Sequence, residues 1–178
     1  MTYKSKLEKT ISAYQGDVEK IFNVSLGDIP LVPYFQWSMI LAKAHVDVNT
    51  EKSEYSLFDI RCNNNIFTKL LPQSIVDYIG IHEMVHLAHA KSVKPADWLK
   101  LHESNKYIAE CVADYATHKI LAMHGITPNE YEFIPGVVIS ISHLSEQAKF
   151  LQTKLEKLKT NITTYIQNIN YDSENSLA

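Results

Sequence analysis

Two histidines and one glutamate in the middle of the chain have the types and the spacing of a metal site. His82 and His86 are four residues apart, so in a helix their imidazoles lie on one face about one turn apart and can converge on one ion. Glu83 follows His82 directly, and its carboxylate can reach a water held beside that face. This HExxH pattern is typical of a zinc site that activates water, so we expect Zn²⁺ as the cofactor and Glu83 as the general base.

The residues around these three favour a buried helix. The neighbouring positions are apolar, so only the helix face that holds His82, Glu83 and His86 is suited to solvent. These apolar residues are Ile79, Ile81, Met84, Val85 and Leu87. A surface helix with accidental histidines would be more polar. Two satisfied core histidines beside a solvated glutamate are the alternative interpretation, because a five-residue pattern can arise by chance.

A catalytic zinc takes three protein ligands and leaves one position to water, so a third donor must come from elsewhere. Glu110 and Asp114 are four residues apart on a mostly apolar segment, where two unpaired carboxylates are costly unless a cation or donors meet them. We expect Glu110 to be the third ligand. Asp114, one turn along, is then placed to accept a hydrogen bond from an imidazole N–H of a ligand.

Three alternatives to this ligand set remain open. His89 lies on the same helix face as His82, but it is seven residues, or about 10 Å along the helix axis, away. His82, His86 and His89 can therefore hardly all bind one ion. His102 has no supporting neighbours. Glu110 and Asp114 can also form a solvated helix face, as exposed carboxylates often do.

Apolar residues at three- and four-residue spacings predict the helices that position the site. The first runs from residue 3 to about 23. The second begins at Pro72 to Ser74 and carries the HExxH motif to about Lys91, and the third begins after Ser104 or Asn105 and ends near Gly125.

Alternating residues between the first two helices predict a small sheet. Apolar and polar side chains alternate in residues 44–49 and 55–62, which predicts two strands paired as a hairpin. Two prolines give residues 29–34 an extended path. Residues 92–104 are expected to form a connection with a short helical turn around Trp98.

The C-terminal part is expected to form a long helix, residues 141–170, after an irregular segment at residues 125–136. Its apolar residues alternate between spacings of three and four over four heptads: Ile141, Leu144, Ala148, Leu151, Leu155, Leu158, Ile162, Tyr165 and Ile169. Such regularity predicts a long helical partner. The partner is either the N-terminal helix or the same helix of a second subunit, which would give a homodimer.

Composition predicts one globular domain over residues 1–178, because 46% of the residues are hydrophobic and 21% are charged. We divide it into an N-terminal helix (1–25), a core (29–138), the long helix (141–170) and a polar tail (171–178). Cys62 and Cys111 are expected to be core residues, because their spacing fits neither a disulfide framework nor a cysteine zinc site.

The charge and hydropathy of the chain exclude some partners. The net charge of −3 predicts no non-specific capture by nucleic acid or by an anionic membrane. The N-terminus lacks the apolar core of a signal peptide, and the longest uncharged run, Ile29–Ala42, is too short to span a bilayer. We therefore expect a cytoplasmic protein without a membrane partner.

The segment Pro72–Leu87 resembles the zinc-helix region of the SprT-like and YgjP-like metallopeptidase domains, in which Pro-x-x-Val-Ile-Asp-Tyr-Val leads into His-Glu-Leu-x-His-Leu. The likeness covers about residues 57–90. Those relatives take their third ligand from a histidine just before a Phe-Trp pair, where this chain has Val93 and Lys94. The segment Glu110–Asp114 instead resembles the Glu-x-x-Ala-Asp element of gluzincins, including HtpX-type and IrrE/ImmA-type peptidases, whose Glu binds zinc and whose Asp supports the site.

These resemblances imply an α+β, zincin-like fold with long N- and C-terminal helices. In such a fold, a small sheet containing antiparallel strands lies above the active-site helix, and an edge strand can align an extended peptide. The implied function is a zinc-dependent peptidase that acts on a protein or peptide. A regulatory or binding module with a structural metal, in a nucleic-acid-linked process or elsewhere, is the alternative. The donor for a developing oxyanion stays open among Tyr107, Tyr115, His118 and His143.

Overall fold

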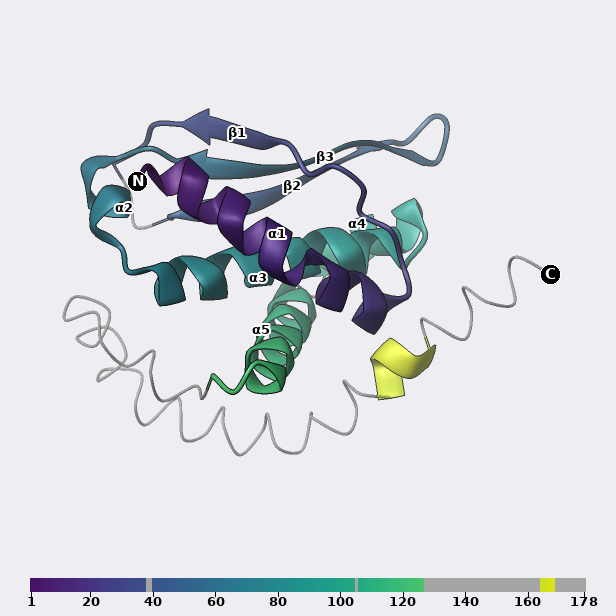
Figure 1. The fold of residues 1–178 in the computed structure, drawn as a ribbon. Coiled ribbons are helices and arrows are strands. Elements are labelled where there is room, and N and C mark those ends of the chain that lie inside the picture. Colours follow the sequence, from purple (N-terminus) through teal and green to yellow (C-terminus); the bar gives the residue numbers. More distant parts are fainter. Residues whose placement is uncertain (38–39, 105, 127–163, 169–178) are drawn as a thin grey trace, which may run out of the picture.

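The computed structural model describes residues 1–37, 40–104, 106–126 and 164–168, which form an α+β fold (Figure 1). In chain order the elements are α1 (Tyr3–Phe22), β1 (Leu31–Tyr34), β2 (Ala42–Asn49), β3 (Glu54–Asn63), α2 (Ile66–Leu70), α3 (Gln73–Lys91), α4 (Pro95–Ser104) and α5 (Lys106–Met123). The three strands lie above α1 and α3, and α5 runs away from α3 on the side opposite the sheet (Figure 1). Helix α3, which carries the HExxH motif, is therefore the central layer.

The sheet has the strand order β1-β3-β2. Strands β2 and β3 form the expected antiparallel hairpin, with a register shift between Asp47 and Val48. Strand β1 pairs parallel to β3, so the extended residues 29–34 contain a third strand that the sequence did not predict. Among the described strands, β2 is an edge strand, and it is the one packed most closely along α3.

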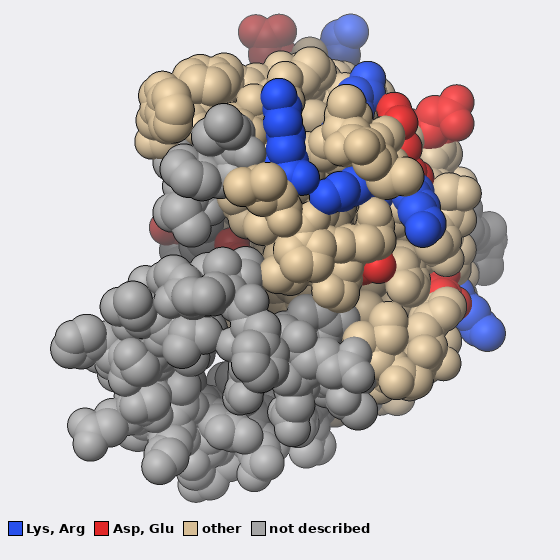
Figure 2. Space-filling model, turned by 60° about the vertical axis from the view of Figure 1, so that its left-hand side comes forward, with Lys and Arg blue, Asp and Glu red and all other residues tan. Residues whose placement is uncertain are grey.

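Alternation gives the sheet one apolar and one polar face. Ala42, Ala44 and Ile60 point into the main core with the residues of α3. Lys43 and Arg61, which are cross-strand partners, belong to the opposite face. On the face shown in Figure 2, Lys and Arg side chains lie over the described surface with Asp and Glu side chains among and beside them.

Helix α1 packs closely against α3 through a glycine. A Cβ atom added to Gly80 would lie 2.7 Å from Cγ2 of Thr10, so a larger residue at position 80 would force the two helices apart. The Thr10 hydroxyl donates to Oδ1 of Asp77 at 2.6 Å and fixes the register of the pair. The first turns of α3 are thereby held by α1, while the middle of α3 contacts β2 and α5.

Two helices differ from the expectations. Helix α4 has ten residues where a connection with one turn was expected. Pro95 at its first position has a preset φ, and Trp98 is buried, so both local geometry and packing stabilise it. Helix α2 was not expected at all; Asn65 caps it by accepting a hydrogen bond from the Thr68 N–H.

The expected C-terminal helix and the irregular segment before it lie almost entirely outside the described residues. Only 164–168 are described; they are helical, and Ile166 is buried in the main core. Cys62 and Cys111 are both buried, as expected, and no disulfide joins them. Within the described ranges, no helix is both long and apolar enough to cross a membrane.

Candidate metal centre

The structure brings His82, His86 and Glu110 together where α5 crosses α3. Nε2 of His82 lies 3.1 Å from Nε2 of His86 and 3.3 Å from Oε2 of Glu110. The same glutamate oxygen lies 3.6 Å from Nε2 of His86. One lone-pair atom from each of the three residues therefore points to a common position.

These separations fit a bound metal ion. Zinc ligated at about 2.0–2.1 Å with tetrahedral angles holds its ligand atoms about 3.3 Å apart, close to the distances observed. The imidazoles are largely buried, with side-chain exposures of 15% for His82 and 10% for His86, whereas Glu110 is 43% exposed. The group could hold a metal ion with one side open to solvent, and its donor set of two imidazoles and a carboxylate suits zinc.

Asp114 and Tyr78 support the first histidine from behind. Oδ1 of Asp114 lies 3.1 Å from Nδ1 of His82, so the ring can keep its proton on Nδ1 and present Nε2 to an ion. The hydroxyl of Tyr78 donates to the same Asp114 oxygen at 2.9 Å, and its ring stacks on that of His82. Sequence reasoning missed Tyr78; the only signal was its position four residues before His82, on the same helix face.

The carboxylates set the electrostatics of the centre. Burial disfavours a charged imidazole, but the hydrogen bonds with Asp114 and Glu110 outweigh it and raise the pKa of His82 to about 10. Hydrogen bonds with His82 and His86 hold the pKa of Glu110 well below its usual range. Two carboxylates thus face two imidazoles across a partly buried interface, so a positive charge is stabilised at this position.

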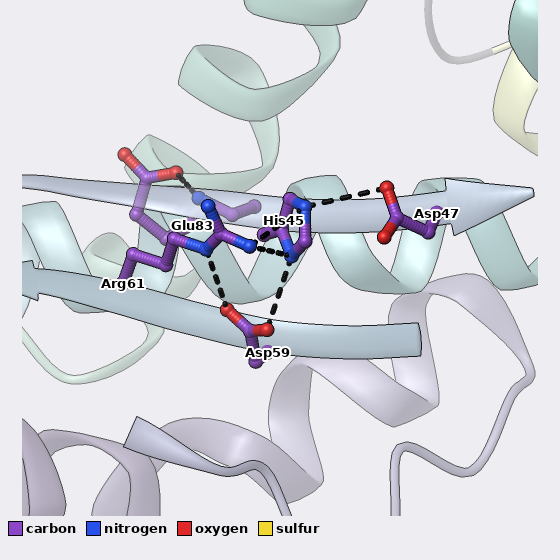
Figure 3. Close-up of polar contacts among 6 residues, drawn as sticks. His45, Asp47, Asp59, Arg61 and Glu83 are labelled. Carbon is purple, nitrogen blue, oxygen red and sulfur yellow. Dashed lines mark hydrogen bonds and ion pairs between the residues drawn. The ribbon is translucent and has the colours of Figure 1, made fainter. Parts of the chain in front are cut away.

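Glu83 points from α3 to the edge strand. Burial raises the pKa of its carboxyl group, and Oε2 accepts a hydrogen bond of 2.6 Å from the backbone N–H of Ala44 in β2 (Figure 3). Coulombic interactions with both histidines of the group act in the opposite direction on this pKa. A single carboxylate therefore lies between the candidate ligands and the backbone of β2.

The other histidines considered as ligands lie elsewhere. His89 is fully buried, its Nε2 is 3.0 Å from the Tyr165 hydroxyl, and its ring contacts Phe22 and Trp98. His102 is exposed and packs on Trp98, with ring centroids 4.3 Å apart. Neither belongs to the group formed by His82, His86 and Glu110.

The candidate oxyanion donors differ in position. His118 contacts the Tyr78 ring, with centroids 5.7 Å apart, and Tyr78 in turn donates to Asp114. Tyr115 lines a cavity of about 330 Å³ between α1 and α5, together with Lys20 and Ile166. The side chain of Tyr107 and the whole of His143 lie outside the described part of the chain.

No protein-family model, no curated protein and no solved structure matches this chain. The resemblances to SprT-like and gluzincin peptidases therefore stay predictions. The structure by itself gives a His-His-Glu group that could hold a metal ion of undetermined identity.

Proposed function

We propose that the chain is a zinc-dependent peptidase that hydrolyses peptides lying extended along β2. The observation that carries this proposal is the position of Glu83. Its carboxylate interacts electrostatically with His82 and His86 and also accepts a hydrogen bond from the backbone N–H of Ala44 at the edge of β2. One side chain thus links the group that could hold a metal ion to the strand edge that would receive the peptide.

The hydrogen-bond pattern of the hairpin defines that edge. The Asn63 N–H donates to the Leu41 carbonyl at 2.9 Å, so position 41 is in a hydrogen-bonded pair. Such pairs alternate in an antiparallel ladder, which leaves Ala44 in a non-bonded pair with its N–H and C=O directed away from β3. The bond from Ala44 to Glu83 agrees with this direction. Residues 42, 44 and 46 therefore direct backbone groups to the side of β2 on which no described strand lies.

An extended peptide can add to this side by backbone hydrogen bonds. Antiparallel addition is favoured because it is slightly more stable per residue than parallel addition. A peptide placed in this way passes Glu83 at Ala44, so the bond to be cleaved lies near that point.

The chemistry divides between a metal and the chain's own residues. A bound zinc supplies a Lewis acid that polarises a carbonyl and lowers the pKa of water. Glu83 accepts a proton from the attacking water and passes it to the leaving nitrogen as the C–N bond breaks. Burial, which raises the pKa of Glu83, makes its carboxyl group a better proton carrier near neutral pH. Asp114 and Tyr78 hold the ring of His82 in one orientation.

The test is turnover of a quenched peptide library by zinc-loaded protein. Glu83→Gln should keep the metal and lower kcat by about a hundredfold to ten-thousandfold, since it removes the proton acceptor and leaves the ligands. Glu8→Gln, on an exposed position of α1, is the matched control and should not change turnover. Wild-type protein that binds zinc but cleaves no peptide would refute the proposal and favour a structural metal in a binding module.

A further inference from the structure

The outer face of β2 carries opposite charges at its two ends, and we infer that it selects peptides by charge order. Lys43, His45 and Asp47 are alternate residues on this face. The selected peptide carries a basic residue four positions before an acidic one, with the cleaved bond between them. This inference rests on the proposed use of the β2 edge and specifies the class of peptide.

The positive end of the strand is Lys43. Its side chain is exposed, and Nζ lies 5.3 Å from the centre of the Tyr34 ring. The described residues include no ion pair between Lys43 and a carboxylate. The positive charge of its cross-strand neighbour Arg61 is balanced by Asp59. The Asp59 side chain is only 4% exposed, and one of its oxygens lies 3.6 Å from Nε of Arg61. Among the described residues, Lys43 thus has an aromatic partner in β1 and no carboxylate partner, so an incoming acidic side chain would supply the missing negative charge.

The negative end is Asp47. Its carboxylate contacts Nε2 of His45 at 3.3 Å but remains 57% exposed (Figure 3). The other nitrogen of His45 lies 3.1 Å from buried Asp59, and Nη2 of Arg61 lies 2.8 Å and 2.9 Å from the two ring nitrogens. The ring is therefore held among two carboxylates and a guanidinium (Figure 3). Asp47 thus keeps exposed oxygens at the strand edge, where a basic side chain can reach them.

Strand geometry converts these positions into a sequence rule. Directly opposite residues in a ladder share a face, so peptide side chains beside Lys43 and Asp47 also lie on the outer face. Antiparallel direction places the residue opposite Asp47 four positions before the residue opposite Lys43. The complementary peptide is therefore basic first and acidic second. Ala44, where Glu83 bonds, lies between the two positions, so the cut falls between the two charges.

The expected size of the effect is modest, because both pairs are exposed. A cross-strand ion pair at such a site changes affinity about 1.4-fold to fivefold. Reversing the peptide replaces two attractive pairs with two repulsive ones, so the two charge orders should differ on the order of tenfold at low salt. The difference should shrink with added salt.

Binding can be measured apart from catalysis by fluorescence anisotropy on zinc-loaded Glu83→Gln protein. The probes are two labelled, end-blocked octapeptides of one composition, with Lys four positions before Glu or Glu four positions before Lys. The Lys-first peptide should bind on the order of tenfold more tightly, and Lys43→Asp with Asp47→Lys should invert the order. Equal affinities, an order unchanged by the swap, or no binding of either peptide at millimolar concentration would overturn the inference.

The matched control is Glu51→Lys with Lys52→Asp, a swap in the hairpin turn beyond β2, which should leave the order unchanged. Should the swap on β2 fail to fold, Lys43→Gln and Asp47→Asn alone should each reduce the preference. Turnover by wild-type protein separates the two proposals. Charge-ordered binding without hydrolysis would refute the peptidase, and hydrolysis without charge order would refute the inference.

Discussion

Helix α3 holds two kinds of histidine less than two turns apart. His82 lies opposite Glu110 and Asp114 of α5, and these carboxylates raise its pKa to about 10. His89 lies among Phe22, Trp98 and Tyr165, and burial lowers its pKa to about 3. The helix and the residue type are the same, so the difference comes from the segments packed against each end.

Helical spacing therefore determines which side chains share a helix face, but it does not determine whether a histidine binds a metal or packs in the core. His82, His86 and His89 all fall on one stripe of the sequence. Only the first two face an element that brings carboxylates, while the third serves as a packed core residue with one hydrogen bond. The comparison separates a candidate metal centre from a structural histidine, and each side of it can be tested.

The largest expected effect in this comparison is on stability. His89→Ala should lower the free energy of unfolding by about 3 kcal/mol, since it leaves a cavity beside three aromatic rings and removes the bond to Tyr165. Zinc affinity of the folded protein should stay unchanged. Urea denaturation and metal titration of the same preparation measure both quantities, and a lost metal site with intact stability would reverse the assignment of His89.

A smaller effect is expected at the metal group. Asp114→Ala should weaken zinc affinity about tenfold to a hundredfold, because Asp114 orients the ring of His82 from its Nδ1 side. Competition with a chelating dye gives the dissociation constant, with Asp97→Ala on α4 as the control. An unaltered constant would leave Asp114 as a carboxylate with no influence on the metal.

The third effect is acid sensitivity. The pKa of His89 is lower in the folded protein than its usual value of about 6.5, so the unfolded chain binds more protons below that pH and stability falls as pH falls. From pH 7 to pH 5 this group should cost about 2 kcal/mol. The loss is measured as the difference between wild type and His89→Phe in urea denaturation at each pH. Parallel pH dependences would contradict a neutral, buried His89.

Much of the fold follows from local sequence patterns. The bounds of α1, α3 and the hairpin were predicted closely. Each helix has apolar residues at helical spacing on one face, and each strand alternates apolar and polar residues. Only a short turn around Trp98 was predicted where α4 has ten residues, because the stability of α4 depends on the burial of Trp98. Strand β1 was missed because a parallel pairing leaves no signal in a four-residue strand.

The site was predictable to a different degree. Residue types and spacing suggested that His82, His86 and Glu110 belong together, and the structure brings them within reach of one ion. Their role as ligands and that of Glu83 as general base stay predictions. The contact of Glu83 with Ala44 and the support from Tyr78 depend on how α3 packs against β2 and α5, which no local pattern specifies.

The most direct test of the account is the metal content of purified protein after dialysis against a low concentration of zinc. Wild type and His89→Ala should each hold one zinc per chain by mass spectrometry, whereas Glu110→Ala should hold well below one. Glu103→Ala, an exposed position on α4, is the control and should match wild type. Full occupancy in Glu110→Ala together with loss of zinc in His89→Ala or His102→Ala would contradict the assignment of the centre.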